Sequence, residues 1–353
     1  MTAPQDASEF RTSIDEQLSS FVAGQRLRLE ELGSDLAPFI DAAADFVAGG
    51  KRLRPEFCQA GWLVAGGDPD DPGITAASAA FEWLQGSALA HDDLMDESDT
   101  RRGKPSTHRA FEASHLAADG LGDAAQFGRS AAVLLGDLML SWADEMLRSA
   151  ADLSPTVLAN LSRAFGYFDL CKTEVVAGQF LDVIGQTRTA FSVNEAMRVV
   201  RFKSAKYTIE RPLHVGAALA GADDKVLAKL TSFGLPLGEA FQLRDDLLGV
   251  FGNPSVTGKP AGDDLREGKR TVLIARTAEL TDAAGIELLR RGLGNADHID
   301  ALRELIVSTG AAEAVETDIA ALELQAESAL ATLEPSAQIL LRKLLLKATR
   351  RTY

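Results

Sequence analysis

The sequence predicts an all-α protein, a single large bundle of ten or more helices. Ala- and Leu-rich stretches repeat their apolar residues about every 3.6 positions, which gives each stretch one apolar face when it is helical. Runs of alternating β-branched residues, which would indicate strands, are few. The chain has 353 residues, 46% of them hydrophobic, which is enough for one large domain or two smaller ones.

The helical pattern recurs along most of the chain. It is strongest at about residues 75–95, 130–149, 192–221 and 225–251. No linker rich in Pro, Gly or Ser separates the polar motifs that these segments carry. We therefore expect residues 1–353 to form one domain.

The charge balance excludes some classes of function. With 36 Lys and Arg against 51 Asp and Glu, the formal charge is −15, whereas nucleic-acid binding requires a basic stripe. Cys58 and Cys171 show no metal-binding or CxxC spacing, as expected for buried thiols in a reducing cytoplasm. Residues 1–10 lack the features of a signal peptide, and the most apolar run, 131–142, is too short to span a membrane. We expect a cytoplasmic protein without a transmembrane segment.

Three aspartates stand together in the run His91-Asp92-Asp93-Leu94-Met95-Asp96. On a helix, Asp92 and Asp96 project from the same face, with Asp93 about 100° away. Such close carboxylates repel one another unless a cation lies between them, and oxygen ligands suit Mg²⁺, which completes its shell with water and phosphates. The alternative is a solvated acidic helix face or an N-cap cluster. His91 is expected to orient the aspartates.

A second aspartate pair, Asp245 and Asp246, follows in an apolar helical stretch. Buried aspartates cost several kcal/mol unless they are paired or bind metal, and Arg244 is a candidate partner for one of them. Alternatively, the two aspartate clusters face each other and hold several Mg²⁺ ions around one diphosphate. The loop after this helix carries Lys259 between Gly258 and Pro260, and lysine meets phosphate as a point charge.

A basic segment, Gly49-Gly50-Lys51-Arg52-Leu53-Arg54-Pro55, places three cations after two glycines. Taken alone, such a run is usually a solvated helix end. Its local charge stands out in this acidic chain, which makes it a candidate anion site.

Together these motifs resemble the trans-polyprenyl diphosphate synthase family over about residues 47–271. The matching motifs follow the family's order: GGKRLRP at 49–55, HDDLMD at 91–96 with Arg101-Arg102, GQFLD at 178–182, Lys203-Ser204, and FQLRDD at 241–246. The residues in and around these motifs are most similar to those of short-chain actinobacterial synthases that make geranylgeranyl diphosphate. The resemblance implies helices around a central apolar cavity, a homodimer, and condensation of isopentenyl diphosphate with an allylic diphosphate.

The resemblance also implies residue roles. The Mg²⁺ ligands would be Asp92, Asp96 and Asp245, supported by Asp93 and Asp246. The allylic diphosphate would be held by Arg101, Lys203, Gln242 and Lys259. The metal-free diphosphate of isopentenyl diphosphate would be held by Lys51, Arg54 and Arg102, with Gln85 in a weaker role. Direct catalytic roles would fall to Asp92, Asp96, Asp245, Lys203 and Arg101.

The chain departs from the family pattern at three positions. Gln85 replaces a His, and an amide can donate a hydrogen bond but carries no charge. Gly249 replaces the last Asp of the second motif, so its metal binding should rest on Asp245 and Asp246. Ser204 replaces a Thr and keeps the hydroxyl.

The implied reaction is electrophilic. Mg²⁺ stabilises the departing diphosphate, the double bond of isopentenyl diphosphate attacks the allylic cation, and apolar helix faces exclude water. A class I terpene cyclase shares the ionisation step but needs no GGKRLRP segment. A non-catalytic subunit of a heteromeric synthase would lose an aspartate cluster, which this chain keeps.

Product length is expected to depend on the helix before Asp92. The growing chain would pass small residues, Ser87 and Ala88, and then meet Leu84 and Phe81, which lie roughly 12 and 16 Å along the helix from Asp92. This arrangement predicts elongation past fifteen carbons and a stop near twenty. The alternative is that Ser87 and Ala88 only permit close helix packing.

Overall fold

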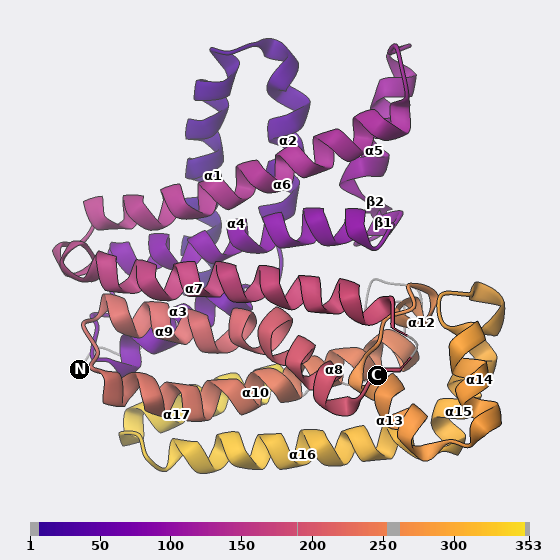
Figure 1. Cartoon of the computed structure of the whole chain (residues 1–353). Helices are drawn as coiled ribbons and strands as arrows, with labels where there is room; N and C mark the ends of the chain where they lie inside the picture. Colours follow the sequence, from indigo (N-terminus) through magenta and orange to yellow (C-terminus); the bar gives the residue numbers. More distant parts are fainter. Residues whose placement is uncertain (1–6, 189, 253–261, 350–353) are drawn as a thin grey trace. The chain divides into compact units, whose positions relative to one another are not determined.

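The computed structural model describes residues 7–188, 190–252 and 262–349 (Figure 1). The chain divides into two compact units, residues 1–165 with 215–222, and residues 166–214 with 223–353. We call them the first and second units. The division falls inside two helices, α7 (Pro155–Gln186) and α9 (Arg211–Leu219). The expectation of one domain stays a prediction.

The other elements of the first unit are nearly all helical. In chain order they are α1 (Ala7–Glu30), η1 (Ser34–Leu36), α2 (Ala37–Val47), α3 (Leu53–Val64), α4 (Pro72–Met95), β1 (Thr100–Arg101), β2 (Lys104–Pro105), α5 (Thr107–Ala117), α6 (Ala124–Ser149) and η2 (Ala150–Asp152). Two-residue strands form the one sheet in the described part of the chain.

The second unit continues the helical pattern. Its remaining elements are α8 (Val193–Val199), the π-helix η3 (Val200–Glu210), α10 (Asp224–Phe251), α12 (Asp263–Arg266), α13 (Val272–Leu280), α14 (Ala283–Gly292), η4 (Ala296–His298), α15 (Ile299–Ser308), α16 (Ala311–Leu330) and α17 (Pro335–Thr349). The prediction of an all-α fold with ten or more helices is confirmed.

Helix α4 starts where the sequence supplies the needed cap. The Asp71 side chain accepts a hydrogen bond from the Gly73 N–H at 2.8 Å, and Pro72 takes the first helical position, where no N–H is required. From there α4 runs antiparallel to α6. Trp83 in the middle of α4 contacts Trp142 in the second half of α6, with ring centroids 5.1 Å apart.

Close packing of α4 on α6 depends on two glycines. A methyl group added at Gly86 would lie 2.8 Å from the sulfur of Met139, and one at Gly136 would lie 2.2 Å from Nε2 of His91. Both distances are too short for ordinary contact. Glycine at these positions therefore sets the spacing of the helix that carries the first aspartates.

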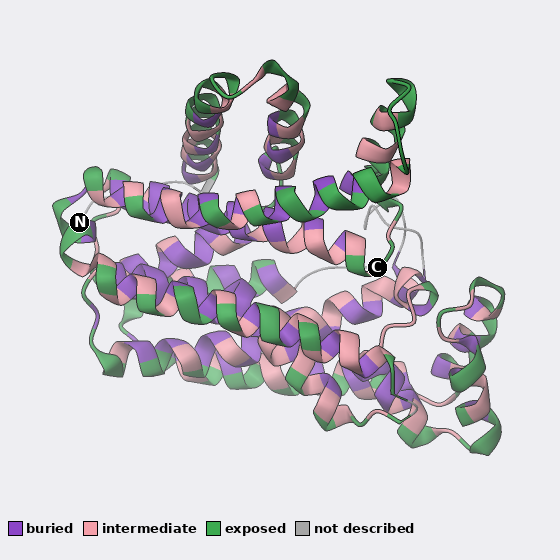
Figure 2. Ribbon diagram, turned by 45° about the horizontal axis from the view of Figure 1, so that its top comes forward, coloured by how far each residue is buried: buried purple, intermediate pink, exposed green. Residues whose placement is uncertain are grey.

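The core of the second unit is aliphatic. Helix α10 packs along α16 and η3, and fully buried residues from three helices, such as Leu243, Leu273 and Val315, form one cluster (Figure 1). Figure 2 shows buried and exposed residues alternating around the long helices, as their sequence periodicity predicts. No helix in the described ranges is long and apolar enough to cross a membrane.

The segment expected as one helix at residues 192–221 differs from that prediction. It is helical throughout most of its length but changes register twice, from α8 to the π-helix η3 and then to α9. An eleven-residue π-helix is unusual, because such turns occur mostly singly and often at functional sites.

Candidate functional site

The first aspartate cluster lies at the C-terminal end of α4. Asp92 is on the last turn with its side chain 20% exposed, and Asp96 is the residue that follows the helix, its N–H bonded to the Asp92 carbonyl at 2.8 Å. Negative charge at a helix C-terminus is unfavourable, since the helix dipole is negative there. The position therefore favours a bound cation.

Asp93 is buried behind this cluster and is bound by Arg101. The guanidinium donates from Nε to Asp93 Oδ2 at 2.6 Å and from Nη2 to Oδ1 at 2.5 Å, a two-pronged pairing. Arg101 Nη2 also lies 4.0 Å from Asp92. The metal role predicted for Asp93 and the diphosphate role predicted for Arg101 stay predictions.

A tight hairpin positions Arg101. Strands β1 and β2 pair Arg101 with Lys104, and the two residues between them, Arg102 and Gly103, have φ of 52° and 75°. Positive φ at both positions is typical of two-residue hairpin turns. The chain therefore reverses direction directly after Arg101.

His91 does not fit its predicted role. Its Nε2 lies 3.2 Å from the Val133 carbonyl oxygen and 3.6 Å from Asp137, both on α6. The ring thus contacts the neighbouring helix. The expectation that His91 orients the aspartates is wrong, because the i, i+4 face that it shares with Ser87 packs on α6.

Within the basic segment, Arg52 has a structural role. Arg52 is 2% exposed, has a left-handed backbone with φ of 52°, and donates to Asp15 at 2.5 Å and 2.9 Å, to the Val47 carbonyl at 2.6 Å, and to Glu82. It therefore links α1, α2 and α4 and belongs to the core. The ligand roles predicted for Lys51 and Arg54 in this segment stay predictions.

The predicted isopentenyl diphosphate ligands come from separate elements of the first unit. Lys51 is exposed, and Arg54 is half-buried on the first turn of α3. A methyl group at Gly50 would lie 3.9 Å from Nη2 of Arg102, so the β1–β2 turn brings this guanidinium against the basic segment. Gln85 is half-buried on α4.

The second cluster is on α10. Gln242 donates from Nε2 to Asp246 Oδ1 at 2.8 Å, while Oδ2 of Asp246 is buried and has no hydrogen-bond partner within the described residues. Asp245, on the same turn, is half-buried. Arg244, considered as a partner for one aspartate, forms a two-pronged pair with Glu316 on α16, with Nη2 to Oε2 at 2.7 Å.

Burial raises the pKa of Asp246 well above its ordinary value. Negative charge on Asp264, Asp245 and Asp182 raises this pKa further, whereas the hydrogen bond from Gln242 lowers it. A cation beside these carboxylates would favour the ionised form. The orphaned oxygen and the local charge thus fit a Mg²⁺ ligand.

Asp264 was missed by sequence reasoning. A methyl group at Gly249 would lie 1.9 Å from Asp264 Oδ2, so the carboxylate of Asp264 occupies the space that a side chain at 249 would need. The loss of the family's last aspartate is therefore matched by a carboxylate from α12. The sequence signal for it is the pair Asp263-Asp264, which follows the loop that carries Lys259.

Lys203 lies on η3 and is paired with Asp182 of α7. Its Nζ donates to Asp182 Oδ2 at 2.7 Å, with the two side chains 21% and 10% exposed. A methyl group at Gly178 would lie 2.3 Å from the backbone nitrogen of Lys203. This explains the GQFLD motif, since its glycine admits the η3 backbone and its aspartate binds the lysine. Lys259 lies outside the described residues.

The predicted chain-length residues fall on two faces of α4. Phe81 and Leu84 are buried, Ala88 is half-buried, and their spacing places them in one stripe with Asp92. Ser87 is 3% exposed and lies four residues from both Trp83 and His91, which contact α6. This favours a packing role for Ser87 and leaves Phe81, Leu84 and Ala88 as candidates.

The carboxylates suit Mg²⁺ without forming a closed cage. Within residues 7–188, 190–252 and 262–349, no three His, Cys, Asp or Glu side chains are gathered closely enough to hold a metal ion. Mg²⁺ commonly binds one or two carboxylates and completes its shell with water and substrate phosphates.

Comparisons with known proteins agree with one another. A family model described as polyprenyl synthetase matches residues 38–307. The structure of geranylgeranyl pyrophosphate synthase from Corynebacterium glutamicum, complexed with isoprenyl diphosphate and magnesium, superposes with a TM-score of 0.92 at 39% identity, covering 99% of this chain and all of that one.

Curated relatives differ in product. Geranylgeranyl diphosphate synthase of Sulfolobus acidocaldarius is 30% identical, over 82% of this chain and 78% of its own length. Geranylfarnesyl diphosphate synthase of Aeropyrum pernix is also 30% identical, over 76% of this chain and 79% of its own. Identity at this level does not distinguish product lengths.

Proposed function

Because the chain belongs to the polyprenyl synthetase family, we propose that it condenses isopentenyl diphosphate with an allylic diphosphate and makes mainly geranylgeranyl diphosphate. The observation that carries this proposal is the set of carboxylates. Both aspartate clusters are kept, and the space beside Gly249, where the family's last aspartate is missing, is filled by the carboxylate of Asp264. A non-catalytic subunit would have no need of this compensation.

Magnesium is the implied cofactor. Its proposed ligands are Asp92 and Asp96 in the first unit and, separately, Asp245, Asp246 and Asp264 in the second. When bound, Mg²⁺ would neutralise the charge that develops on the departing diphosphate.

Two different sets of basic side chains would bind the two substrates. We assign Arg101 and Lys203, each held by an aspartate at 2.7 Å or less, to the allylic diphosphate. Lys51, Arg54 and Arg102 would bind isopentenyl diphosphate, which brings no metal and so needs fixed positive charge. Neither group needs to act as a nucleophile, because the substrate's double bond attacks the allylic carbon.

The proposed product length depends on Phe81, Leu84 and Ala88, which lie on the same face of α4 as Asp92. Ala88 is small and leaves the first level open, whereas Leu84 and Phe81 would stop the chain at about twenty carbons, since they lie roughly 12 and 16 Å from Asp92 along the helix. We also expect a cytoplasmic homodimer. Helix α6 exposes Phe127, Val133 and Leu134, which is a candidate face for a second copy.

Incubating the purified protein with labelled isopentenyl diphosphate, Mg²⁺ and each allylic starter in turn tests the proposal. Label should enter prenyl diphosphates only when both substrates and Mg²⁺ are present. Conversion of an allylic diphosphate alone into hydrocarbon would indicate a terpene cyclase instead. Absence of turnover with every starter would favour a non-catalytic subunit.

A further inference from the structure

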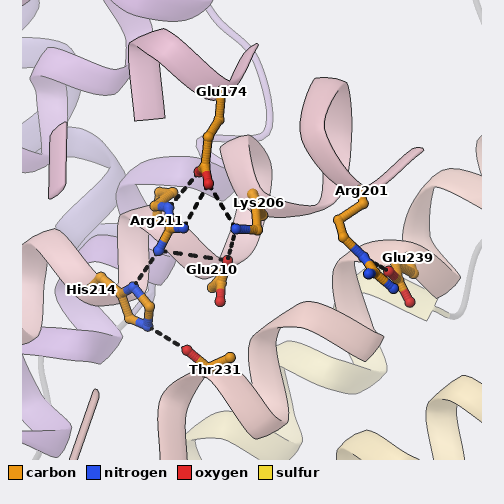
Figure 3. Close-up of polar contacts among 8 residues, drawn as sticks. All are labelled: Glu174, Arg201, Lys206, Glu210, Arg211, His214, Thr231 and Glu239. Carbon is orange, nitrogen blue, oxygen red and sulfur yellow. Dashed lines mark hydrogen bonds and ion pairs between the residues drawn. The ribbon is translucent and has the colours of Figure 1, made fainter. Parts of the chain in front are cut away.

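A buried polar network in the second unit has no role in the assignments above. It joins Glu174 on α7, Lys206 on η3, Arg211 and His214 on α9, and Thr231 on α10 (Figure 3). The Glu174, Lys206 and Arg211 side chains are only 12%, 16% and 8% exposed. Charges buried to this extent are costly unless they are fully paired.

The network pairs its charges internally. Glu174 and Glu210 balance Lys206 and Arg211, and Glu210 Oε2 lies 3.7 Å from Arg211 and 3.9 Å from Lys206. Burial lowers the pKa of His214 to about 4, so this ring is neutral near pH 7. A guanidinium can only donate, so Nδ1 of His214 accepts from Arg211 Nη1 at 2.9 Å.

Glu174 binds two residues that lie five positions apart. One carboxylate oxygen accepts from Lys206 Nζ at 2.7 Å and Arg211 Nη2 at 2.9 Å, and the other accepts from Arg211 Nε at 2.6 Å. In an α-helix, residues five apart point about 140° away from each other. In a π-helix the backbone bonds join residues five apart, so their side chains stack.

The backbone shows this π register at the same place. The N–H of Arg211 bonds to the carbonyl of Lys206, five residues earlier. Glu174 can therefore bind both side chains only while η3 keeps its π-helical register. The ion-paired cluster and the backbone geometry stabilise each other.

Lys203 lies in the same π-helix, one turn before this cluster. Its backbone is confined by Gly178 of α7, and the backbone two residues later is confined by Gly238 of α10, where a methyl group would lie 2.6 Å from the Ala205 carbonyl oxygen. A one-residue change of register would rotate Lys203 about the helix axis by about 100°. That rotation would separate it from Asp182.

We propose that Glu174 is a positioning residue for Lys203, acting by holding η3 in the π-helical register through Lys206 and Arg211. The inference rests on the proposed function, in which Lys203 binds the allylic diphosphate. Glu174 itself touches no substrate. It sets where on the helix the lysine emerges.

The Glu174→Gln variant tests this. The KM for the allylic diphosphate should rise about tenfold, the usual order for losing a hydrogen-bonded charge, with less than a twofold change for isopentenyl diphosphate. Backbone amides of residues 200–210 should exchange hydrogen faster. Equal rises in both KM values, or unchanged exchange in η3, would overturn the proposal.

Matched variants separate positioning from general loss of stability. Asp318→Asn breaks a comparable carboxylate–arginine pair with Arg276 in the same unit, and should leave the allylic KM unchanged. Thr231→Val removes the distal end of the network, and should also leave it unchanged. If Glu174→Gln does not fold, Lys206→Met removes one of the two bound cations and should reproduce the selective rise in KM; a normal allylic KM in that variant would overturn the proposal.

The exchange measurement needs no substrate. If the wild-type protein transfers no prenyl group, the proposed function fails, yet faster exchange in η3 of Glu174→Gln would still support the register role. Unchanged exchange would refute that role independently of activity.

Discussion

Restoring the family's aspartate at position 249 is expected to lower activity. A methyl group there would already lie 1.9 Å from Asp264 Oδ2, so a side chain must displace the Asp264 carboxylate. An added carboxylate would also face Asp246, whose pKa is already raised by burial and by Asp264. Two like charges about 4 Å apart repel by roughly 4 kcal/mol at an effective dielectric constant of about 20.

The Gly249→Asp variant should therefore lose at least about tenfold in kcat at saturating Mg²⁺, because a misplaced carboxylate reduces stabilisation of the departing diphosphate. Steady-state kinetics over a range of Mg²⁺ concentrations measure this. Gly249→Ala adds the steric displacement without charge and should also be impaired.

The double variant Gly249→Asp, Asp264→Gly is the decisive control. It returns a single carboxylate to the same space from the opposite side and should recover most of the lost kcat. A Gly249→Asp single variant as active as wild type would refute the reasoning, since Asp264 would then not depend on the space left by glycine.

Three further changes test other parts of the site. Arg54→Ala should raise the KM for isopentenyl diphosphate about tenfold, because a charge-assisted contact contributes roughly 1.5–3 kcal/mol; an equal rise for the allylic substrate would show that the two sites are confused. Ala88→Phe should shorten the main product to fifteen carbons in product chromatography, because Ala88 lies on the same face of α4 as Asp92. Ser87→Phe should instead mainly lower the free energy of unfolding. An unchanged product from an active Ala88→Phe enzyme would exclude a path for the growing chain along this face. Asp246→Asn should raise the free energy of unfolding of the metal-free protein at pH 7. Because the pKa of Asp246 is higher in the folded protein than in the unfolded protein, Asp246 destabilises the fold at a pH above the unfolded-state pKa. The gain in the free energy of unfolding, measured with denaturant, should therefore vanish as the pH falls towards about 4. No gain at pH 7 would contradict the assignment.

Local sequence patterns predicted those features of the fold and site that depend on residues close together in the sequence. The helices and the i, i+4 placement of Asp92 and Asp96 follow from spacing a few positions apart. The ordered motifs also located Lys203 and the basic segment.

Features that depend on tertiary contacts were not predictable in the same way. Arg52 and Arg54 are alike in sequence, yet Arg52 is buried because Asp15 and Glu82 approach it from other helices. His91 packs on α6 because Gly136 leaves room for its ring.

The register of η3 is a further example. No local signal distinguishes a π-helix from an α-helix at residues 200–210, because the choice depends on Glu174 from α7 and on close approach at Gly178 and Gly238. Likewise, the carboxylate that fills the space beside Gly249 comes from a separate helix.

Chain-length analysis of the dephosphorylated products tests the central claim most directly. Labelled isopentenyl diphosphate would be incubated with farnesyl diphosphate and Mg²⁺, using Asp92→Ala as the inactive control. The predicted result is a main product of twenty carbons that depends on Mg²⁺ and is absent with the control. A main product longer than twenty carbons, or no transfer above the Asp92→Ala level with any starter, would contradict a geranylgeranyl diphosphate synthase.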